Sequence, residues 1–559
     1  LVNLGAYPLY TKGEPREAVT VFDIVNGGGV LLPMRAGVEI PSKPLLMHWL
    51  AALASLVMGG VSEFSVRLPS ATFAIAGLLV CYLYIRRLFD DVVALLAAVM
   101  MATSFQYLQS ATSARVDMTL TFFMELAFFE FLMMAQGLTR RKMLLYFALA
   151  LAVLTKGPVG LLLPAGVALA WIALERRWDM IGKLGLVRGA IIVLIIAGGW
   201  YVGAIIEGGP GFFRKQILAE NLARFFGSAD FHEGHQHPLY YMDMALLAGF
   251  LPWTLLLFVV MRRARRDPLP LNASFRYMMI WFAVVLVFYH FPQSKRGVYL
   301  LCLYPALATL VAIYVRETIL LPERARRPVL FAARASGFVM TVVGESALAA
   351  VALLAISPNV LRGLLARVGI VAPRFVPMLD SAVGEYALLS VVLPIVAMAA
   401  GLFLLRTRPA IERVVMGVAG GMLAMVLVGN LIVVPAIANT LSLKDFTQHA
   451  MSVIGDSRAA YLGGLNYDFA FYSRQSFPIV TLDDPDLPEY LIGWRAIYDA
   501  MSPERRGHFT VVMVSNPTAL DGSNEMVLLQ TRAAPAPSLP KPEEGYIETM
   551  LSAPAEPRS

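Results

Sequence analysis

Apolar residues in this chain gather into twelve runs that approach the length of a membrane-spanning helix. The runs lie at residues 71–86, 92–108, 118–136, 143–155, 157–174, 189–206, 239–261, 277–291, 297–315, 329–356, 386–405 and 414–440. A straight helix needs about 20 apolar residues to cross the hydrocarbon core, and it satisfies its own backbone hydrogen bonds there. The pattern therefore predicts an all-α polytopic membrane protein.

The pattern differs at both ends of the chain. The opening apolar stretch LVNLGAYPLY is expected to be the end of one further helix, which makes about 13 transmembrane helices in all. After residue 440, mixed and turn-rich segments such as GGLNYDFAFYSRQSFPIVTLDDPDLPEY predict a small α/β domain with a Pro-rich terminus. We therefore predict a transmembrane domain at 1–440 and a soluble domain at 441–559.

Composition supports the same class of protein. Of the 559 residues, 58% are hydrophobic and 15% are charged, and the mean hydropathy is +0.65. Soluble proteins carry about 45–50% apolar and about 25% charged residues, so a cytoplasmic enzyme is excluded. The two cysteines, Cys81 and Cys302, both lie in apolar runs, which excludes an extracellular disulfide framework.

In a membrane protein with a net charge of +7, the positions of the basic residues first indicate which loops are cytoplasmic. Every second loop is rich in basic residues, and these basic clusters lie within 86–87, 140–142, 176–183, 262–266, 324–327 and 406–413. The positive-inside rule places those loops in the cytoplasm. Residues 1–70, 109–117, the turn at Lys156, 207–238, 292–296, 357–385 and the tail from 441 are then predicted to face outward.

Several cations lie on the predicted outer side, against that rule. They are Lys12, Arg16, Arg35, Lys43, Arg67, Arg115, Lys156, Arg214, Lys215, Arg224, Lys295 and Arg296. Each one alone is explained by a solvated or snorkelling side chain. As a set they favour an anionic ligand, such as a phosphate-bearing lipid headgroup at the membrane surface, rather than nucleic acid.

Carboxylates on this side are few. Glu14 and Glu17 lie in KGEPREA, and Asp117 lies in ARVDM at the start of a helix. An isolated carboxylate at membrane depth is costly unless it is paired or used, so Asp117 is a candidate functional residue, with Arg115 as its local partner. The alternative is that Asp117 caps the helix N-terminus.

Three of the seven histidines share one outer loop, ADFHEGHQHP. His232, His235 and His237 have the residue type and close spacing that a structural zinc ion requires, and a plain polar loop is the alternative. LTKGPVG at 154–160 is not a phosphate loop, because it lacks the Gly-x4-Gly-Lys-Ser/Thr spacing. The sequence also contains no dinucleotide-binding fingerprint. Nucleotide-driven chemistry is disfavoured, and no cofactor is expected to be required for the chemistry.

An ordered set of motifs over residues 1–315 resembles one enzyme family. GEPREA, SKPLLMHWLAAL, VSEFSVRLPSA, RVD, TKGPVG, LAENLARFF, LPW and KRGVYLLCLYPALA follow one another in the order seen in the aminoarabinose lipid A transferases, which belong to the protein mannosyltransferase-like glycosyltransferases of the GT-C fold. The first loop of that family usually reads Asp-Glu-x-Arg-Tyr. Here Gly13 replaces the aspartate, which leaves Glu14 as its stand-in.

The resemblance implies an inverting transfer on the periplasmic side of a Gram-negative inner membrane. The donor is 4-amino-4-deoxy-L-arabinose on undecaprenyl phosphate, the acceptor is a phosphate of lipid A, and the outcome is polymyxin resistance. It implies that Asp117 and Glu14 are the catalytic carboxylates, that Lys43, Arg224 and Tyr299 bind the lipid phosphate, and that Lys156, Lys295, Arg296, Arg16 and Arg115 assist. A monomer is expected.

Two rival functions stay open from the sequence. One is the same chemistry with a protein hydroxyl or another glycolipid as acceptor. The other is transport of a polyprenyl lipid. Transport is disfavoured because charges within the apolar runs are few, the main ones being Glu125, Glu130, Asp243 and Glu345, and because no second, related half is evident.

Overall fold

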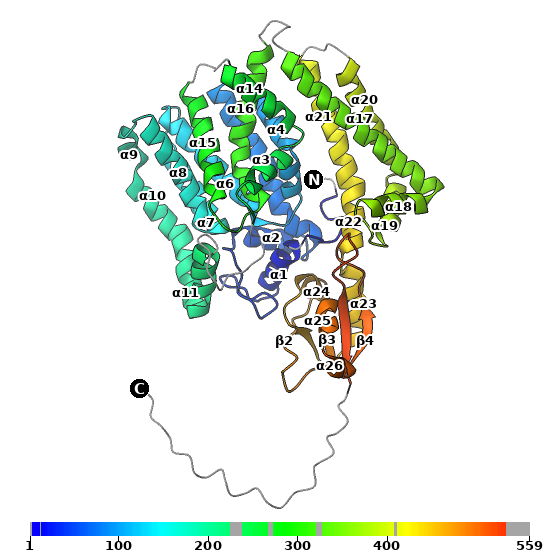
Figure 1. The fold of residues 1–559 in the computed structure, drawn as a ribbon. Helices are drawn as coiled ribbons and strands as arrows, with labels where there is room; N and C mark the ends of the chain where they lie inside the picture. Colours follow the sequence, from blue (N-terminus) through cyan, green and yellow to red (C-terminus); the bar gives the residue numbers. More distant parts are fainter. Residues whose placement is uncertain are drawn as a thin grey trace, which may run out of the picture.

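The computed structural model describes residues 3–11, 13–223, 237–266, 272–319, 327–406 and 411–532. Helices lie side by side in one bundle, and a small sheet projects from one end of it (Figure 1). The helical bounds are α1 (Glu14–Val25), α2 (Leu46–Val57), α3 (Glu63–Leu88), α4 (Asp91–Ala102), α5 (Phe105–Ala111), α6 (Val116–Ala135), α7 (Lys142–Lys156), α8 (Val159–Leu174), α9 (Asp179–Leu184), α10 (Leu186–Val193), η1 (Leu194–Gly198), α11 (Gly199–Phe212), η2 (Phe213–Ala223), α13 (Tyr241–Gly249), α14 (Thr254–Arg266), α15 (Ala273–His290), η3 (Gly297–Leu303), α16 (Tyr304–Ile319), α17 (Arg327–Ile356), α18 (Pro358–Arg367), α19 (Phe375–Glu385), α20 (Ala387–Arg406), α21 (Ile411–Val428), η5 (Gly429–Val433), α22 (Val434–Leu441), α23 (Lys444–Ile454), α24 (Tyr467–Ser473), α25 (Arg495–Asp499) and α26 (Pro503–Gly507). The strands are β1 (Ala459–Leu462), β2 (Ile479–Val480), β3 (Tyr490–Trp494), β4 (Phe509–Val514) and β5 (Met526–Thr531).

All twelve predicted apolar runs fall in helices, but fewer of them are full spans than expected. Within the described ranges, 8 helical segments are long and apolar enough to cross a membrane, or up to 10 if each bent pair counts as one span. The bent pairs are α4 with α5, at 67°, and α13 with α14, at 113°. The two remaining runs form α7 and α8, of 15 and 16 residues, which are shorter than a straight span. Gly157, with a φ of 88°, separates the two helices.

Helix α6 forms the centre of the bundle, because 89% of the residues in an 18-residue apolar stretch of this helix are buried. Trp281 of α15 packs against Phe128 of α6 at 4.3 Å between ring centroids, and its indole N–H donates to the carbonyl of Cys302 in η3. The hydroxyl of Tyr277 donates to the carbonyl of Phe128. Large aromatic rings with satisfied polar ends dominate core energetics, so this contact fixes α6 against α15 and η3.

The C-terminal sheet has five strands in the order β2-β1-β3-β5-β4. Strand β1 pairs in parallel with β2 and β3, whereas β5 pairs antiparallel with β3 and β4. The sheet therefore confirms the predicted mixed α/β fold after the last span. The helical segment Met416–Ile454 runs across the predicted domain boundary at residue 440, so the position of that boundary stays a prediction.

The sheet domain rests on the N-terminal helices. Helix α24 packs against α1, and the Tyr472 hydroxyl accepts a hydrogen bond from the backbone N–H of Leu9 at 2.8 Å. Apolar residues of α1, α2, α23 and α24 share one buried cluster. This end of the bundle therefore brings α1 together with the sheet domain, and the candidate site lies here.

Candidate active site

Asp117 lies at the end of the bundle that carries the sheet. It is in the first turn of α6, whose N-cap position is Arg115, so the structure does not support the alternative that Asp117 is the cap. The residue is 8% exposed, and its carboxylate pairs with the ammonium of Lys156, at 2.5 Å between Oδ1 and Nζ. Lys156 is the last residue of α7, and its ammonium lies 4.2 Å from the centroid of the Tyr299 ring in η3. Three elements thus meet at one ion pair.

Further cations surround this pair. The positive charges of Arg115 and Arg296 act on the Asp117 carboxylate. The Nε of Arg296 is buried and has no hydrogen-bond partner in the part of the chain that the structure describes. Lys295 is buried, and its ammonium donates to the backbone carbonyl of His237 at 3.3 Å. The N-terminal end of α6 therefore combines one buried carboxylate with several cations, one of which has an unused donor.

Glu14 holds the turn that precedes Asp117. Its Oε1 accepts from the backbone N–H of Ala114 at 3.0 Å and from Nε of Arg67 at 2.8 Å, and its Oε2 accepts from the hydroxyl of Thr11. Burial by itself raises the pKa of the Glu14 carboxyl, but the Arg67 charge and these hydrogen bonds leave the pKa below its usual value. Glu14 is therefore an ionised anchor between α1, α3 and the start of α6, and the catalytic role expected for it stays a prediction.

Glu17, one turn further along α1, is the centre of a second buried network. Its carboxylate pairs with Arg16 at 2.7 Å, with Nε2 of His48 at 2.8 Å and with Arg35 at 3.5 Å. Burial raises the pKa of Glu17, but Arg16, His48 and Arg35 together hold it well below its usual value. Arg16, expected to assist phosphate binding, is thus engaged by the adjacent Glu17.

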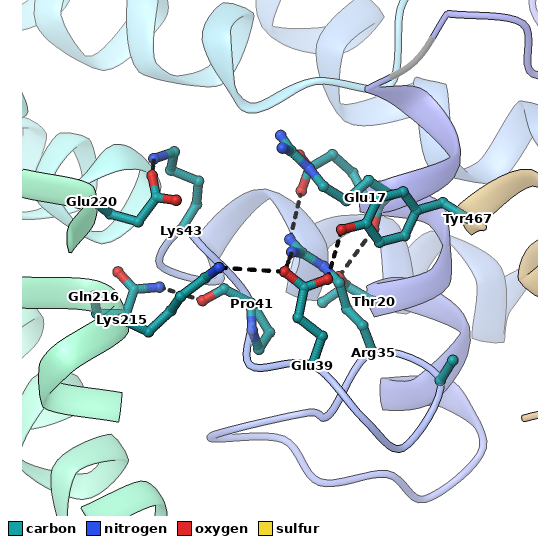
Figure 2. A network of polar contacts seen from close by, with 12 residues as sticks. Glu17, Thr20, Arg35, Glu39, Pro41, Lys43, Lys215, Gln216, Glu220 and Tyr467 are labelled. Carbon is teal, nitrogen blue, oxygen red and sulfur yellow. Dashed lines mark hydrogen bonds and ion pairs between the residues drawn. The ribbon is translucent and has the colours of Figure 1, made fainter. Parts of the chain in front are cut away.

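The network continues from α1 to η2 and the sheet domain (Figure 2). Glu39 accepts from the hydroxyl of Tyr467 in α24 at 2.6 Å and lies 3.5 Å from Nζ of Lys215 in η2. Lys43, expected to bind the lipid phosphate, pairs with Glu220 of η2 at 2.6 Å. Segment 35–43 is therefore tied on one side to η2 and on the other to the sheet domain.

The predicted site residues thus separate into groups. The structure brings together Asp117, Lys156, Tyr299, Arg115 and Arg296, and it places Lys43 with Glu220 in a neighbouring ion pair. Arg224, His232 and His235 lie outside the described residues. His237 stacks on Tyr241 at 3.9 Å between ring centroids. Within the described ranges no group of three or more His, Cys, Asp or Glu side chains is placed to hold a metal, and the zinc site stays a prediction.

Sequence reasoning missed the partners of these residues. The sequence did offer one signal that Glu14 and Glu17 act near each other. Glu17 follows Glu14 by three positions, which places both side chains on one face of α1. Nothing in the sequence marks His48, Glu39 or Glu220 as their partners, because each joins an element distant along the chain.

Parts of the sequence are similar to membrane glycosyltransferases. The family model described as "Dolichyl-phosphate-mannose-protein mannosyltransferase" matches residues 42–201. An uncharacterized protein of Aquifex aeolicus is 31% identical over 55% of this chain and 68% of its own length. The undecaprenyl phosphate-alpha-4-amino-4-deoxy-L-arabinose arabinosyl transferase of Enterobacter sp. is 26% identical over 64% of this chain, and the match spans 63% of that enzyme.

The fold is shared by a solved structure. ArnT from Cupriavidus metallidurans, crystallised with undecaprenyl phosphate, superposes with a TM-score of 0.68 at 19% identity, over 94% of this chain and 95% of that one. The chain is therefore a multi-pass membrane protein with the GT-C glycosyltransferase fold. Its sequence is similar, over part of its length, to glycosyltransferases whose names give a polyprenyl phosphate-linked sugar as the donor.

Proposed function

We propose that this enzyme transfers 4-amino-4-deoxy-L-arabinose from undecaprenyl phosphate to a phosphate of lipid A, on the periplasmic face of a Gram-negative inner membrane. The observation that carries the proposal is the Asp117–Lys156 ion pair beside Tyr299, Arg115 and Arg296 at the outer end of the bundle. The arabinosyl transferases among its relatives supply the sugar and the lipid carrier in the proposal.

The cations suit a phosphate leaving group. As the bond between the sugar and the donor phosphate breaks, that phosphate keeps the electron pair and gains negative charge. An ammonium has three donors, and Asp117 uses one donor of Lys156, so the others remain for phosphate oxygens. The unused Nε of Arg296 is a further donor. Donors fixed in place before the reaction stabilise such charge more strongly than water does.

The Asp117 carboxylate suits the sugar. A phosphate acceptor is already anionic near neutral pH, so its oxygen attacks the anomeric carbon without a strong general base. Attack on the face opposite the leaving phosphate gives inversion. Asp117 then stabilises the positive charge that develops on the ring or binds the amine of the sugar, while Glu14 keeps the turn at Ala114 in place.

Mass spectrometry of lipid A tests the substrate assignment. Cells that carry the gene are expected to show an aminopentose on the lipid A phosphates and to survive polymyxin, and cells without it to show neither. Unmodified lipid A together with a lost sugar on proteins would instead favour a hydroxyl acceptor, the chemistry that the description of the matching family names.

Matched variants test the site. Asp117→Asn and Lys156→Gln are each expected to lower the transfer rate at least about 100-fold, since they remove preorganised charge at the reacting centre. Asp179→Asn and Lys183→Gln remove an exposed pair of the same residue types at the far end of the bundle and are expected to leave the rate unchanged. Full activity of both site variants would refute the assignment.

A further inference from the structure

A basic pocket lies at the end of the bundle opposite the candidate active site. It has a volume of about 840 Å³ and opens between the start of α7 and the link from α9 to α10. Helix α7 runs from this pocket to Lys156 over 15 residues, which corresponds to about 22 Å at 1.5 Å per residue. The pocket is therefore separate from the site around Asp117.

Four cations line this α7–α10 pocket: Arg140, Arg141, Lys142 and Arg188. None of the residues that line it is an acid, and none of the four cations forms an ion pair within the part of the chain that the structure describes. Two nearby cations at the same end of the bundle do form ion pairs. Arg177 and Lys183 both pair with Asp179, at 2.9 and 2.7 Å. The lining of the pocket thus carries four cations without an ion-pair partner among the described residues.

The walls of the pocket are fixed by close packing. The hydroxyl of Tyr146 in α7 donates to the carbonyl of Leu184 at 3.2 Å. A Cβ atom at Gly189 of α10 would lie 2.0 Å from the Tyr146 ring, so the helices approach this closely only with glycine there. Gly185 turns the chain between α9 and α10 with a φ of 69°. This packing fixes α7 against α10, and the four exposed cations lie around the contact, Arg140 and Arg141 from the loop before α7 and Lys142 and Arg188 from the helices.

The lining is also strongly apolar. Met143, Ile181, Leu186 and Val187 line the same pocket, and Val187 is 75% exposed. On a membrane protein such side chains face acyl chains. An inorganic anion would use the cations and leave this apolar surface without a partner, whereas a phospholipid has a phosphate for the cations and chains for the apolar wall. Clusters of Lys and Arg at the cytoplasmic surface are typical sites for anionic headgroups.

We propose that the α7–α10 pocket binds an anionic phospholipid of the cytoplasmic leaflet. The headgroup phosphate lies among Arg140, Arg141, Lys142 and Arg188, and an acyl chain packs along Leu186 and Val187. The site is distinct from donor and acceptor binding, so its occupancy does not depend on the transferase activity.

Native mass spectrometry of the full chain, released from detergent with added lipid, tests the proposal. Phosphatidylglycerol is expected to stay bound, and phosphatidylcholine with the same acyl chains is expected to be lost. The double variant Arg141→Gln/Arg188→Gln is expected to weaken phosphatidylglycerol binding about 10- to 30-fold, because each cation near the surface contributes about 1 kcal/mol. The matched double variant Arg177→Gln/Lys183→Gln removes two cations from the same end of the bundle and is expected to bind as the parent does.

The outcomes separate the explanations. Equal retention of both lipids, or an equal loss in the two double variants, would overturn the proposal, since net charge or annular lipid would then account for binding. Complete displacement of the lipid by millimolar inorganic phosphate would also overturn it, because the apolar wall would contribute nothing. Thermal unfolding of each variant establishes that it is folded, and if Arg141→Gln/Arg188→Gln does not fold, Arg188→Gln alone is compared with Lys183→Gln under the same criteria.

Discussion

Replacing Arg67 with methionine probes how the N-terminal segment is held in place. Arg67 lies in α3 and is 0% exposed. Its guanidinium donates to the carbonyls of Leu4, Tyr7 and Pro8 and to both oxygens of Glu14, at 2.8 to 3.4 Å. One side chain therefore satisfies three backbone carbonyls and balances one buried carboxylate.

The size of the effect follows from burial. Arg67→Met leaves Glu14, which is 1% exposed, without its paired counter-ion. Removing one member of a buried ion pair costs on the order of 3–5 kcal/mol. Lys444→Met is the matched control, because Lys444 pairs with Glu63 at 3.1 Å but is 41% exposed. An exposed pair contributes about 1 kcal/mol or less, so the two variants are expected to differ by at least about 2 kcal/mol.

Equilibrium unfolding in mixed micelles, followed by tryptophan fluorescence, measures both free energies. The double variant Glu14→Gln/Arg67→Met is expected to be more stable than Arg67→Met alone, because it leaves no buried charge uncompensated. If Arg67→Met loses no more stability than Lys444→Met, or if the losses at Glu14 and Arg67 simply add, the buried pair does not hold this segment and the reasoning is wrong.

The remaining predictions concern groups elsewhere in the chain. Burial and the negative charge of Glu14 raise the pKa of the Asp468 carboxyl to about 7. The folded state therefore loses stability as the pH rises from about 4 to 7, because the unfolded chain releases this proton first. Asp468→Asn is expected to raise the free energy of unfolding at pH 8 and to leave it unchanged at pH 3. Glu125 of α6 is fully buried, and neither carboxyl oxygen has a hydrogen-bond partner in the described chain, so Glu125→Met is expected to stabilise the protein by about 1–3 kcal/mol in the same unfolding assay. Gly189→Ala is expected to lower the midpoint of thermal unfolding, because the added Cβ would clash with the Tyr146 ring. Gly182→Ala is expected to leave the midpoint unchanged, because no atom lies within 4 Å of its Cβ position. Equal midpoints for the two variants would contradict the tight α7–α10 contact.

Much of the fold could be predicted from the sequence. All twelve apolar runs became helices, because apolar runs of this length bury their backbone polar groups in lipid only as helices. The chemistry of the candidate site was also visible in part. Asp117 and Lys156 were placed on one side of the membrane from the alternation of basic loops alone, and the structure pairs them.

The pairing itself was decided by the tertiary structure. Asp117 and Lys156 are 39 positions apart, and Lys43 and Glu220 are 177 apart, so no local pattern relates them. The choice of partner depends on which helix ends pack together, and that depends on contacts such as the aromatic packing of Trp281 on α6. The same reason explains Glu14, which the sequence presents as an acid on an outer loop. Only the packing of α1 against α3 shows that Arg67 neutralises it in the interior.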